Sequence, residues 1–369
     1  MESRFKISFP AIRGIQAGRE YYVAMVPLHL IADIFRFDDD TQLPAELRAQ
    51  RTLNKARIPQ IARYITENKN NYVFSALTAS INGNVKFEEV GNEADNTKFG
   101  MLSSTMSSKF IINDGQHRRE AIKRAIQEEP DLKDETIAVV FFLDKGLERS
   151  QQMFTDLNRY SIRPNRSLGL LYDHRNDLAG ISKMLCIDSG PFNSLVEMEK
   201  SSVSPRSKKL FTLSAIHTAC RALLDQSEIK NFDEASQVCK EYWHEIAKHF
   251  PEWRMVRNNE LSAGEVRSDK IHTHGIVLQA LGNVGCQMLA DNPKDWKKKL
   301  TPLKEIDWSR NNKTQWEGRA LTGGTVSKTS NHVTLTTNLI KKRLGLTLSP
   351  DEKRVEDAYS RGQSGRKTN

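Results

Sequence analysis

The sequence predicts an α+β fold, in which a small mixed-sheet α/β domain is followed by a mostly α-helical C-terminal part. Between residues 109 and 158, a strand, a turn, a helix, a second strand and a second helix follow one another, as in small α/β domains. After about residue 180, apolar residues recur with helical spacing. Four segments show this spacing: residues 211–226, 233–250, 275–290 and 331–344.

The length of the chain favours more than one domain. A single hydrophobic core seldom grows beyond about 250–300 residues, and this sequence has 369. We therefore expect one domain over residues 1–180 and a mainly helical, basic domain over residues 181–359. Residues 360–369 are small, polar and basic, which predicts a disordered tail.

The first domain is expected to open with a strand and a helix between residues 21 and 34, where apolar residues are frequent. An apolar stripe predicts a helix over residues 45–69. Alternating apolar residues over residues 72–83 predict a strand that ends in an Asn-Gly-Asn turn. Residues 88–108 are polar and poor in aliphatic side chains, so we interpret them as a loop or lid.

The clearest part of the sequence comes next. A strand, a turn and a helix are predicted over residues 109–113, 114–115 and 118–126. A strand and two helices follow over residues 137–143, 147–158 and 168–172. The strand of this second group is an uninterrupted apolar run, which predicts burial on both faces. Ser167 is the expected N-cap of the last helix.

Composition argues against several classes of protein. No run approaches the roughly 18–20 apolar residues of a membrane-spanning helix, and the N-terminus lacks the apolar stretch of a signal peptide. The four cysteines form no Cys-x-x-Cys pair and have no histidine at zinc-ligand spacing, so we assign no metal site. The cysteine pattern predicts reduced, mostly buried thiols in a cytoplasmic protein. The mean hydropathy of −0.57 predicts a soluble and rather polar chain.

The positive charge is concentrated in one part of the chain. The net charge is +9, and residues 1–150 hold 21 Lys and Arg against 21 Asp and Glu. All the net positive charge therefore follows residue 150. Such an asymmetry indicates either a polyanionic partner for the basic part or only a soluble basic surface.

Residues 114–118, Asp-Gly-Gln-His-Arg, form what we call the DGQHR box, and they lie where a predicted strand meets a helix. The first turn of a helix offers free backbone N–H groups and a positive dipole end, and glycine lets the backbone approach a phosphate. Arg118 and Arg119 add guanidinium donors, and His117 adds an acid or base. Asp114 can cap the helix, hold an arginine or bind a metal. The box thus predicts a phosphate site; alternatively, Asp114 only caps the helix and the arginines are solvated.

The box and its surroundings resemble a known family. A strand, Asp-Gly-Gln-His-Arg and a helix mark the DGQHR-domain proteins, and the box is similar to phosphate-binding boxes of the ParB/sulfiredoxin-like superfamily. The likeness continues in the segment Phe-Thr-Asp-Leu-Asn-Arg that starts at residue 154, and in residues 54–65, 316–319 and 334–341. Together these segments resemble the DndB family, the DGQHR-domain proteins of bacterial DNA phosphorothioation (dnd) systems, over nearly the whole chain.

The resemblance implies a bacterial, cytoplasmic DNA-binding regulator, acting as a transcriptional repressor of the modification operon. The implied partners are double-stranded DNA at the operator of its own operon, other phosphorothioation proteins, and a second copy of the chain, because operator-binding regulators are commonly dimeric. No membrane partner is expected. The basic residues that we expect to contact DNA are Arg206, Lys208, Lys209, Lys297, Lys298, Lys299, Arg319, Lys328, Lys341, Lys342 and Arg343.

The expected nucleotide- or phosphate-binding site extends beyond the box. Arg57 approaches from the upstream helix, and Asn158 and Arg159 approach from the downstream helix if the strands over residues 109–113 and 137–143 pair in parallel. The full set is Asp114, Gly115, Gln116, His117, Arg118, Arg119, Asn158, Arg159 and Arg57.

Two other functions would use the same features. A related Asp-Gly-Gln-Gln-Arg box marks nucleotide-dependent DNA nickases of phage defence, so Asp114, His117 and Arg118 could be catalytic in a nickase or NTPase that takes ATP or another NTP with Mg²⁺. Gln116 stands where sulfiredoxin has its reactive cysteine, which argues against that chemistry, and the chain has no P-loop motif. The third possibility is a non-catalytic scaffold for modification or restriction proteins. We favour the regulator and assign no catalytic residue.

Overall fold

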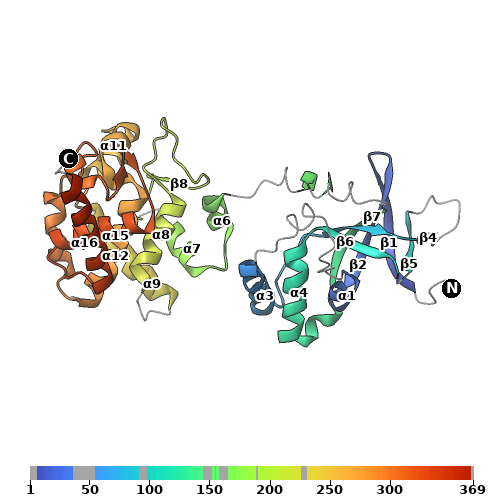
Figure 1. Ribbon diagram of the computed structural model, residues 1–369. Helices are drawn as coiled ribbons and strands as arrows, with labels where there is room; N and C mark the ends of the chain where they lie inside the picture. Colours follow the sequence, from blue (N-terminus) through green and yellow to red (C-terminus); the bar gives the residue numbers. More distant parts are fainter. Residues whose placement is uncertain are drawn as a thin grey trace. The chain divides into compact units, whose positions relative to one another are not determined.

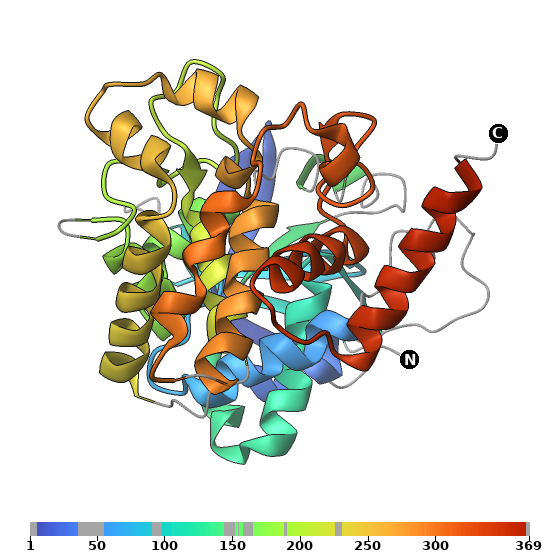
Figure 2. The same cartoon turned by 90° about the vertical axis from the view of Figure 1, so that its left-hand side faces the viewer.

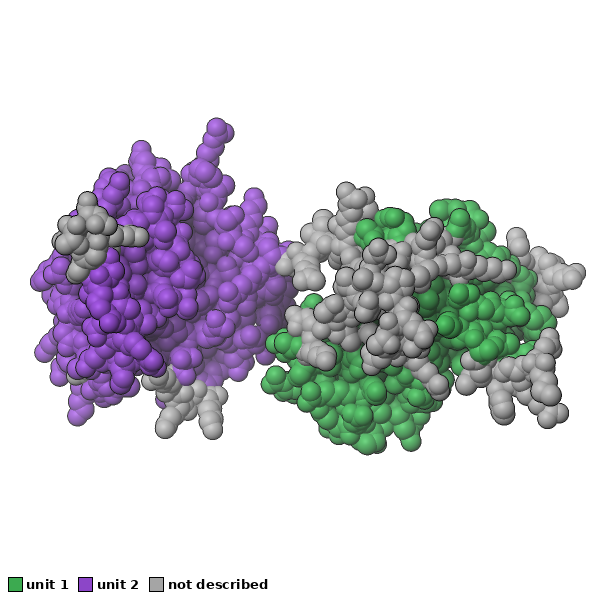
Figure 3. Space-filling view, viewed as in Figure 1, with its two compact units in different colours: residues 1–162 green, residues 163–369 purple. Residues whose placement is uncertain are grey.

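The computed structural model divides the chain into two compact units, residues 1–162 (unit 1) and residues 163–369 (unit 2), which Figure 3 shows in different colours. The boundary precedes the expected one, so residues 163–180 belong to the helical unit and not to the first domain. The structure describes residues 6–35, 55–90, 98–105, 107–143, 152–153, 155–157, 165–187, 190–225, 231–291 and 293–366.

Unit 1 is built on a seven-stranded mixed sheet with the strand order β4-β5-β1-β2-β7-β3-β6 (Figure 1). Its strands are β1 (Lys6–Gln16), β2 (Arg19–Pro27), β3 (Leu77–Asn82), β4 (Val85–Glu89), β5 (Phe99–Thr105), β6 (Lys109–Asp114) and β7 (Thr136–Leu143). Neighbouring strands pair antiparallel, except β3 and β7, which pair in parallel. The mixed sheet followed by a helical unit confirms the predicted α+β fold class.

Three helices pack against one face of this sheet (Figure 1). They are α1 (Leu28–Ile34), α3 (Ile58–Glu67) and α4 (Gln116–Glu128), with the short 3₁₀ helices η1 (Lys55–Arg57) and η3 (Pro130–Asp134) before α3 and after α4. An ion pair between Lys69 and Glu129 joins the C-terminal ends of α3 and α4. The two helices therefore run in the same direction and begin at the same end of the unit.

The sheet corrects several sequence predictions. Residues 99–105, interpreted as a loop or lid, form β5, and the pattern is hard to recognise because two of its three buried residues are Gly100 and Ser104. Strand β1 has no counterpart among the predicted strands. In β7, Ile137, Val139 and Phe141 are buried whereas the residues between them are half-buried, so only one face is fully covered.

Residues 109–113 and 137–143 do not pair in parallel, so the condition under which Asn158 and Arg159 would approach the box is not met. Strand β3 lies between β6 and β7, parallel to β7 and antiparallel to β6, so β6 and β7 run in opposite directions. Of the helix predicted over residues 147–158, the structure describes only residues 152–153 and 155–157, and these are helical.

Unit 2 is mainly helical, as predicted, and surrounds an apolar core that includes the largest buried aromatic residues of the chain. Its helices are α6 (Arg166–Tyr172), α7 (Asp177–Met184), α8 (Leu213–Leu224), α9 (Phe232–Ala247), α10 (Pro251–Arg257), α11 (Ala263–Asp269), η4 (Ile271–Thr273), α12 (Gly275–Asp291), α13 (Trp296–Lys299), η5 (Thr301–Glu305), α14 (Lys313–Trp316), α15 (Ser330–Arg343) and α16 (Pro350–Arg366). Two small sheets pair β8 (Val196–Glu197) with β9 (Phe211–Thr212), and β10 (Leu321–Thr322) with β11 (Thr325–Val326).

Helices α8 and α12 pack closely at the centre of unit 2. A Cβ atom on Gly275 would lie 3.2 Å from the Cβ of Ala215, and one on Gly282 would lie 2.4 Å from the carbonyl oxygen of Ala219. Contacts that advance in the same order along both helices show that α8 and α12 are parallel. Their N-terminal ends therefore open on the same side of unit 2.

Two details of unit 2 differ from the predictions. The N-cap of α6 is Asn165, whose side chain accepts a hydrogen bond from the Leu168 backbone, whereas the Ser167 hydroxyl accepts one from the Ser214 backbone. Residues 360–366, part of the expected disordered tail, continue α16, which contacts α15 and projects away from it towards the C-terminus (Figure 2). The Tyr359 hydroxyl fixes this helix by donating to the carbonyl of Glu317, at 2.8 Å.

Candidate phosphate-binding box and basic surface

The DGQHR box joins strand β6 to helix α4, as the sequence predicts. Strand β6 ends at Asp114, and Gly115 occupies the N-cap position of α4 with a φ of +107°. L-residues with side chains rarely adopt that backbone conformation. A Cβ atom at this position would also lie 2.3 Å from Cδ2 of the buried Leu77. The turn therefore requires glycine whether or not the box binds a ligand.

Asp114 holds an arginine and does not cap the helix. No side chain caps the N-terminus of α4, and the Asp114 carboxylate accepts a hydrogen bond from Nη2 of Arg118 at 2.6 Å. The other terminal nitrogen of Arg118 donates to the carbonyls of Ser75, at 2.5 Å, and Ala76, at 3.0 Å. Arg118 thus ties the end of β6 to the chain that enters β3.

Arg119 is a structural side chain. It is only 5% exposed, donates to the carbonyl of Ala32 at 3.0 Å, and is paired with Glu120. Burial lowers the pKa of its guanidinium from the ordinary value, although the charge of Asp33 partly offsets this. Arg119 therefore fastens α4 to α1 and is not available to a ligand at the surface.

The remaining candidate side chains of the site lie around the first turn of α4 and just before α3. Gln116 and His117 are half-buried there, and Nε2 of Gln116 donates to the carbonyl of Ile112 at 3.4 Å. Arg57 is exposed immediately before α3. Because α3 and α4 begin at the same end of unit 1, Arg57 lies at the end that carries the box.

The segment that follows β7 returns to the neighbourhood of the box. Asn113, which is 1% exposed, donates to the hydroxyl of Ser80 at 2.7 Å and to the sulfur of Met153 at 3.1 Å. Met153 therefore lies beside the strand that ends in the box. Asn158 and Arg159 themselves lie outside the described residues.

Sequence reasoning missed the partners of the box arginines. Ser75, Ala76 and Ala32 contribute backbone carbonyls, which every residue type possesses, so no sequence signal could have identified them. Within the part of the chain that the structure describes, no group of three or more His, Cys, Asp or Glu side chains could hold a metal ion. No helix there is long and apolar enough to cross a membrane.

Three of the basic residues expected to contact DNA are engaged inside unit 2. Arg319 forms two hydrogen bonds with the carboxylate of Glu356, at 2.7 and 3.0 Å, and Lys342 donates to the same carboxylate at 2.6 Å. Lys341, which is 6% exposed, donates to Glu352 at 2.6 Å. These side chains hold α15, α16 and the preceding loop together.

The pKa of Glu356 shows that the carboxylate interacts strongly with the basic side chains around it. Burial alone would raise the pKa of the Glu356 carboxyl, but hydrogen bonds from Arg319 and Lys342 outweigh it and lower the pKa to about 2. The carboxylate is therefore ionised at neutral pH, and it compensates the positive charge that surrounds it.

The other expected DNA contacts lie on the surface of unit 2. Lys297 is 3.9 Å from Glu241, Lys298 is 4.0 Å from Asp295, and Lys299 is exposed beside them. Nζ of Lys209 donates to the carbonyl of Ser194 at 2.9 Å. Among the described side chains, no carboxylate pairs with the remaining four, which are Arg206, Lys208, Lys328 and Arg343.

Most of the chain matches a known protein family. The model of a protein family described as DNA-sulfur modification-associated matches residues 9–347, which is most of the chain. Neither the curated proteins nor the solved structures contain a match.

Proposed function

The chain belongs to the DndB family, and from this premise we propose that it is a DNA-binding regulator of the DNA phosphorothioation system. In this proposal the protein represses the modification operon by binding its operator through unit 2. The DGQHR box of unit 1 binds a phosphate group or a nucleotide.

The distribution of charge is the observation that carries the proposal. Residues 163–369 hold 33 Lys and Arg against 24 Asp and Glu, so unit 2 carries the whole net charge of +9 and unit 1 is neutral. Positive charge concentrated on one unit attracts the phosphates of DNA and releases the counterions condensed on them. This supports a polyanionic partner for unit 2.

The pairing of the basic side chains supports a narrower choice of DNA-contacting residues than the sequence alone does. Arg319 and Lys341 are held by carboxylates inside the unit, so a DNA contact would have to break those pairs. Arg206 and Lys208 are exposed on the segment over residues 201–209 and have no carboxylate partner among the described residues. We assign the main DNA contacts to this segment.

The proposed role of the box rests on its backbone. The first turn of α4 has no side-chain cap, and His117 and Arg57 lie at the same end of unit 1. Backbone N–H groups at such a position favour an anion. Arg118 positions the turn, because its guanidinium holds Asp114 and the start of β3.

The state of Asp114 also bears on the nickase alternative. In a nickase, Asp114 would have to bind a metal ion together with the nucleotide. In the structure its carboxylate accepts a hydrogen bond from Arg118, and no other carboxylate forms a metal-binding cluster with it among the described residues. This arrangement supports phosphate binding more than metal-dependent cleavage.

An electrophoretic mobility assay tests the proposed function. The probe is the DNA upstream of the protein's own operon, and a scrambled fragment of equal length measures non-specific binding. We expect the wild-type protein to shift the operon fragment at low salt and to prefer it to the scrambled one. Failure to shift it at low salt would contradict the proposal.

Matched charge variants locate the surface in the same assay. The double variant Arg206→Ala/Lys208→Ala should bind more weakly because it removes two exposed cations. The control Lys297→Ala/Lys298→Ala removes the same charge from side chains that already lie near carboxylates, and it should bind almost as well as wild type. Equal losses in both variants would argue against an assigned surface at residues 201–209.

A further inference from the structure

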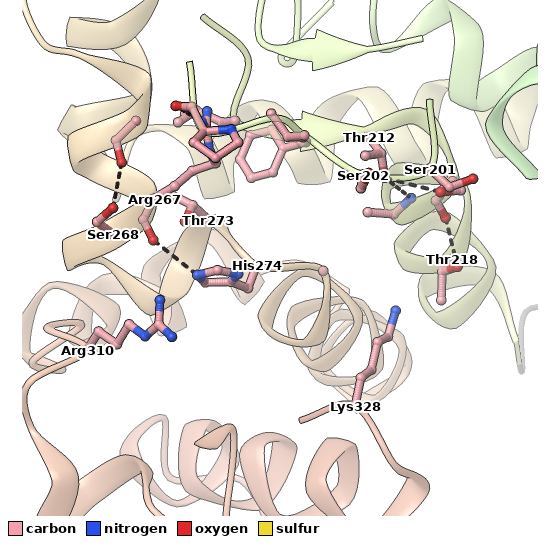
Figure 4. A pocket seen from close by; sticks show the side chains of 18 of the residues that line it. Ser201, Ser202, Thr212, Thr218, Arg267, Ser268, Thr273, His274, Arg310 and Lys328 are labelled. Carbon is pink, nitrogen blue, oxygen red and sulfur yellow. Dashed lines mark hydrogen bonds between the residues drawn. The ribbon is translucent and has the colours of Figure 1, made fainter. Parts of the chain in front are cut away.

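Unit 2 contains an open cavity of about 810 Å³, and no residue of the DGQHR box lines it. Its walls come from the segment over residues 201–205, from the N-terminal ends of α8, α11 and α12, and from the loops that carry Arg310 and Lys328 (Figure 4). Its lining residues come from segments that are distant in sequence, so no local sequence pattern marks the cavity.

Positive side chains converge on this cavity. Arg166, Arg267, Arg310 and Lys328 line it, whereas Glu265 is the only carboxylate among its lining residues. Arg267 is already engaged by backbone carbonyls of residues 204–209 and holds that segment as one wall. The other three cations form no ion pair with any side chain that the structure describes.

Lys328 lies directly at the start of α12. Its Nζ is 3.6 Å from the position that a Cβ atom would take on Gly275, the first residue of that 17-residue helix. The backbone N–H groups of Gly275 and Ile276 have no acceptor among the described residues. The ammonium group and the first turn of α12 therefore face the same volume, which glycine keeps open.

The charge on Lys328 lacks compensation. Burial, together with the positive charges of Arg166 and Arg221, lowers the pKa of its ammonium group. The positive charges around the cavity repel one another, and an anion placed among them would relieve this repulsion. This contrasts with Arg319 and Lys342, whose charges are compensated by Glu356.

The opposite side of the cavity carries Arg310. One terminal nitrogen of Arg310 donates to the carbonyl of Gly324 at 3.0 Å, which fixes the guanidinium and leaves its other N–H groups for a ligand. His274 lies between Arg310 and Lys328 in Figure 4. Burial lowers the pKa of His274 to about 4. The ring is thus neutral at pH 7, and its Nε2 donates to the carbonyl of Arg267 at 3.2 Å.

The remaining lining fits a ligand larger than a single ion. Hydroxyl groups lie along one side, where Ser201, Ser202, Thr212 and Thr218 line the cavity, and Phe211 adds an apolar surface. Cavities of roughly 300–1,000 Å³ with a few convergent polar groups are typical of small-molecule sites. The volume is thus large enough for a nucleotide.

We propose that this cavity is a second phosphate site, which binds a phosphate-bearing ligand of nucleotide size with its phosphate between Lys328, Arg310 and the first turn of α12. The phosphate belongs either to a free nucleotide or to DNA bound by unit 2. Both sources offer the same oxyanion, and guanidinium and ammonium groups bind it by charge-assisted hydrogen bonds.

Titration calorimetry on the full chain tests this site with three probes: pyrophosphate, ATP and a short DNA duplex. The variants are Lys328→Ala and Arg310→Ala, and the matched control is Lys298→Ala, which removes a lysine that is 89% exposed. We expect Lys328→Ala to weaken binding about tenfold or more, as loss of a charge-assisted contact does. The control should bind like wild type. Thermal unfolding checks that each variant is folded.

A box variant separates this site from the one proposed in unit 1. Binding of ATP or pyrophosphate that survives His117→Ala and is lost in Lys328→Ala assigns a free nucleotide to the cavity. If only the duplex binds, and Lys328→Ala weakens it, the phosphate belongs to DNA. The proposal is overturned if none of the three probes binds, or if Lys328→Ala and Lys298→Ala bind equally well. Binding of pyrophosphate and ATP is measured in a separate experiment from operator binding. The proposed cavity site and the proposed regulatory function can therefore be contradicted independently of each other.

Discussion

The DGQHR box of unit 1 and the cavity of unit 2 are both rich in arginine or lysine, but their charges are arranged in opposite ways. In the box, Arg118 is held by Asp114 and by two backbone carbonyls, and Arg119 is buried against α1. In the cavity, Arg310 and Lys328 have no carboxylate partner among the described side chains.

This difference distinguishes basic side chains that stabilise the fold from basic side chains that are available to bind an anion. A cation that is paired with a carboxylate, as Arg118 and Arg119 are, stabilises the fold, and an anionic ligand gains little from it. A cation that faces a cavity without a counter-charge disfavours the empty state and favours an anionic ligand. By this criterion the arginines of the box are structural, and the unpaired cations of unit 2 are the candidates for binding phosphate.

The largest effect should come from removing the counter-charge of a compensated cluster. Glu356→Ala leaves the guanidinium of Arg319, which is 12% exposed, without its carboxylate. Breaking a buried ion pair in this way typically costs about 3–5 kcal/mol of unfolding free energy. All five tryptophans lie in unit 2, so urea unfolding followed by tryptophan fluorescence measures this loss.

A control and a pH series complete that test. Asp351→Ala removes an exposed carboxylate paired with Arg354 and should cause no measurable change. Because the pKa of Glu356 is lowered to about 2, its contribution is complete above about pH 4.5 and is lost as the pH falls towards 2. Glu356→Gln should show less of this acid sensitivity than wild type. An equal loss of stability in Asp351→Ala and Glu356→Ala would contradict the claim that Glu356 stabilises unit 2 by compensating the charge of Arg319.

The second effect concerns the backbone of the box. Gly115→Val places a β-branched residue at a φ of +107° and against Leu77. Together, the strain and the overpacking should cost roughly 2–4 kcal/mol. Circular dichroism should report the earlier unfolding of unit 1. Tryptophan fluorescence should show that the unfolding of unit 2 is less affected. If Gly115→Val were as stable as wild type, the turn would tolerate a side chain and the prediction would be wrong.

A smaller effect is expected when the arginine of the box is removed. Arg118→Ala eliminates the hydrogen bonds to Asp114, Ser75 and Ala76, and should lower the unfolding free energy by about 1–3 kcal/mol. Arg118→Lys should restore only part of it, because an ammonium group cannot reproduce the planar fork. If Arg118→Ala abolished nucleotide binding without any loss of stability, Arg118 would be a ligand contact and not a structural residue.

The smallest effect has the opposite sign. Lys328→Ala removes an ammonium group whose pKa is lowered by burial and by the charges of Arg166 and Arg221. Because that charge is unfavourable in the folded protein, the unfolding free energy should stay unchanged or rise slightly. The measurement is urea unfolding of wild type and variant in the absence of phosphate compounds. A clear loss of stability would show that Lys328 has a structural partner, and the contrast with Arg118 would disappear.

The elements that the sequence predicted well are those with a strong apolar period. Helices α8, α9, α12 and α15 lie where the helical spacing placed them. Strand β5 was missed because small and polar residues fill its buried positions. Helix α16 replaced part of the expected tail because Tyr359 and Glu356 hold it against the rest of unit 2.

The candidate site was predictable only in its outline. The strand, the turn and the helix around Gly115 follow from local sequence, and so does the need for glycine. Whether each basic side chain is paired depends on partners that are distant in sequence. Arg119 reaches a carbonyl 87 residues away, and Arg319 reaches a carboxylate 37 residues away. Sequence alone therefore identified the basic residues without showing which of them remain unpaired.

The most direct test of the central claim is the salt dependence of DNA binding. We compare the slope of log K against log salt for wild type and for Arg206→Ala/Lys208→Ala on the upstream operon fragment. If these unpaired cations contact phosphates, the slope should become less steep by about 2, since each contact contributes about 0.9. The control Lys297→Ala/Lys298→Ala should keep the wild-type slope. An unchanged slope in the first variant, or an equal change in both, would contradict the claim that the unpaired cations of unit 2 bind DNA.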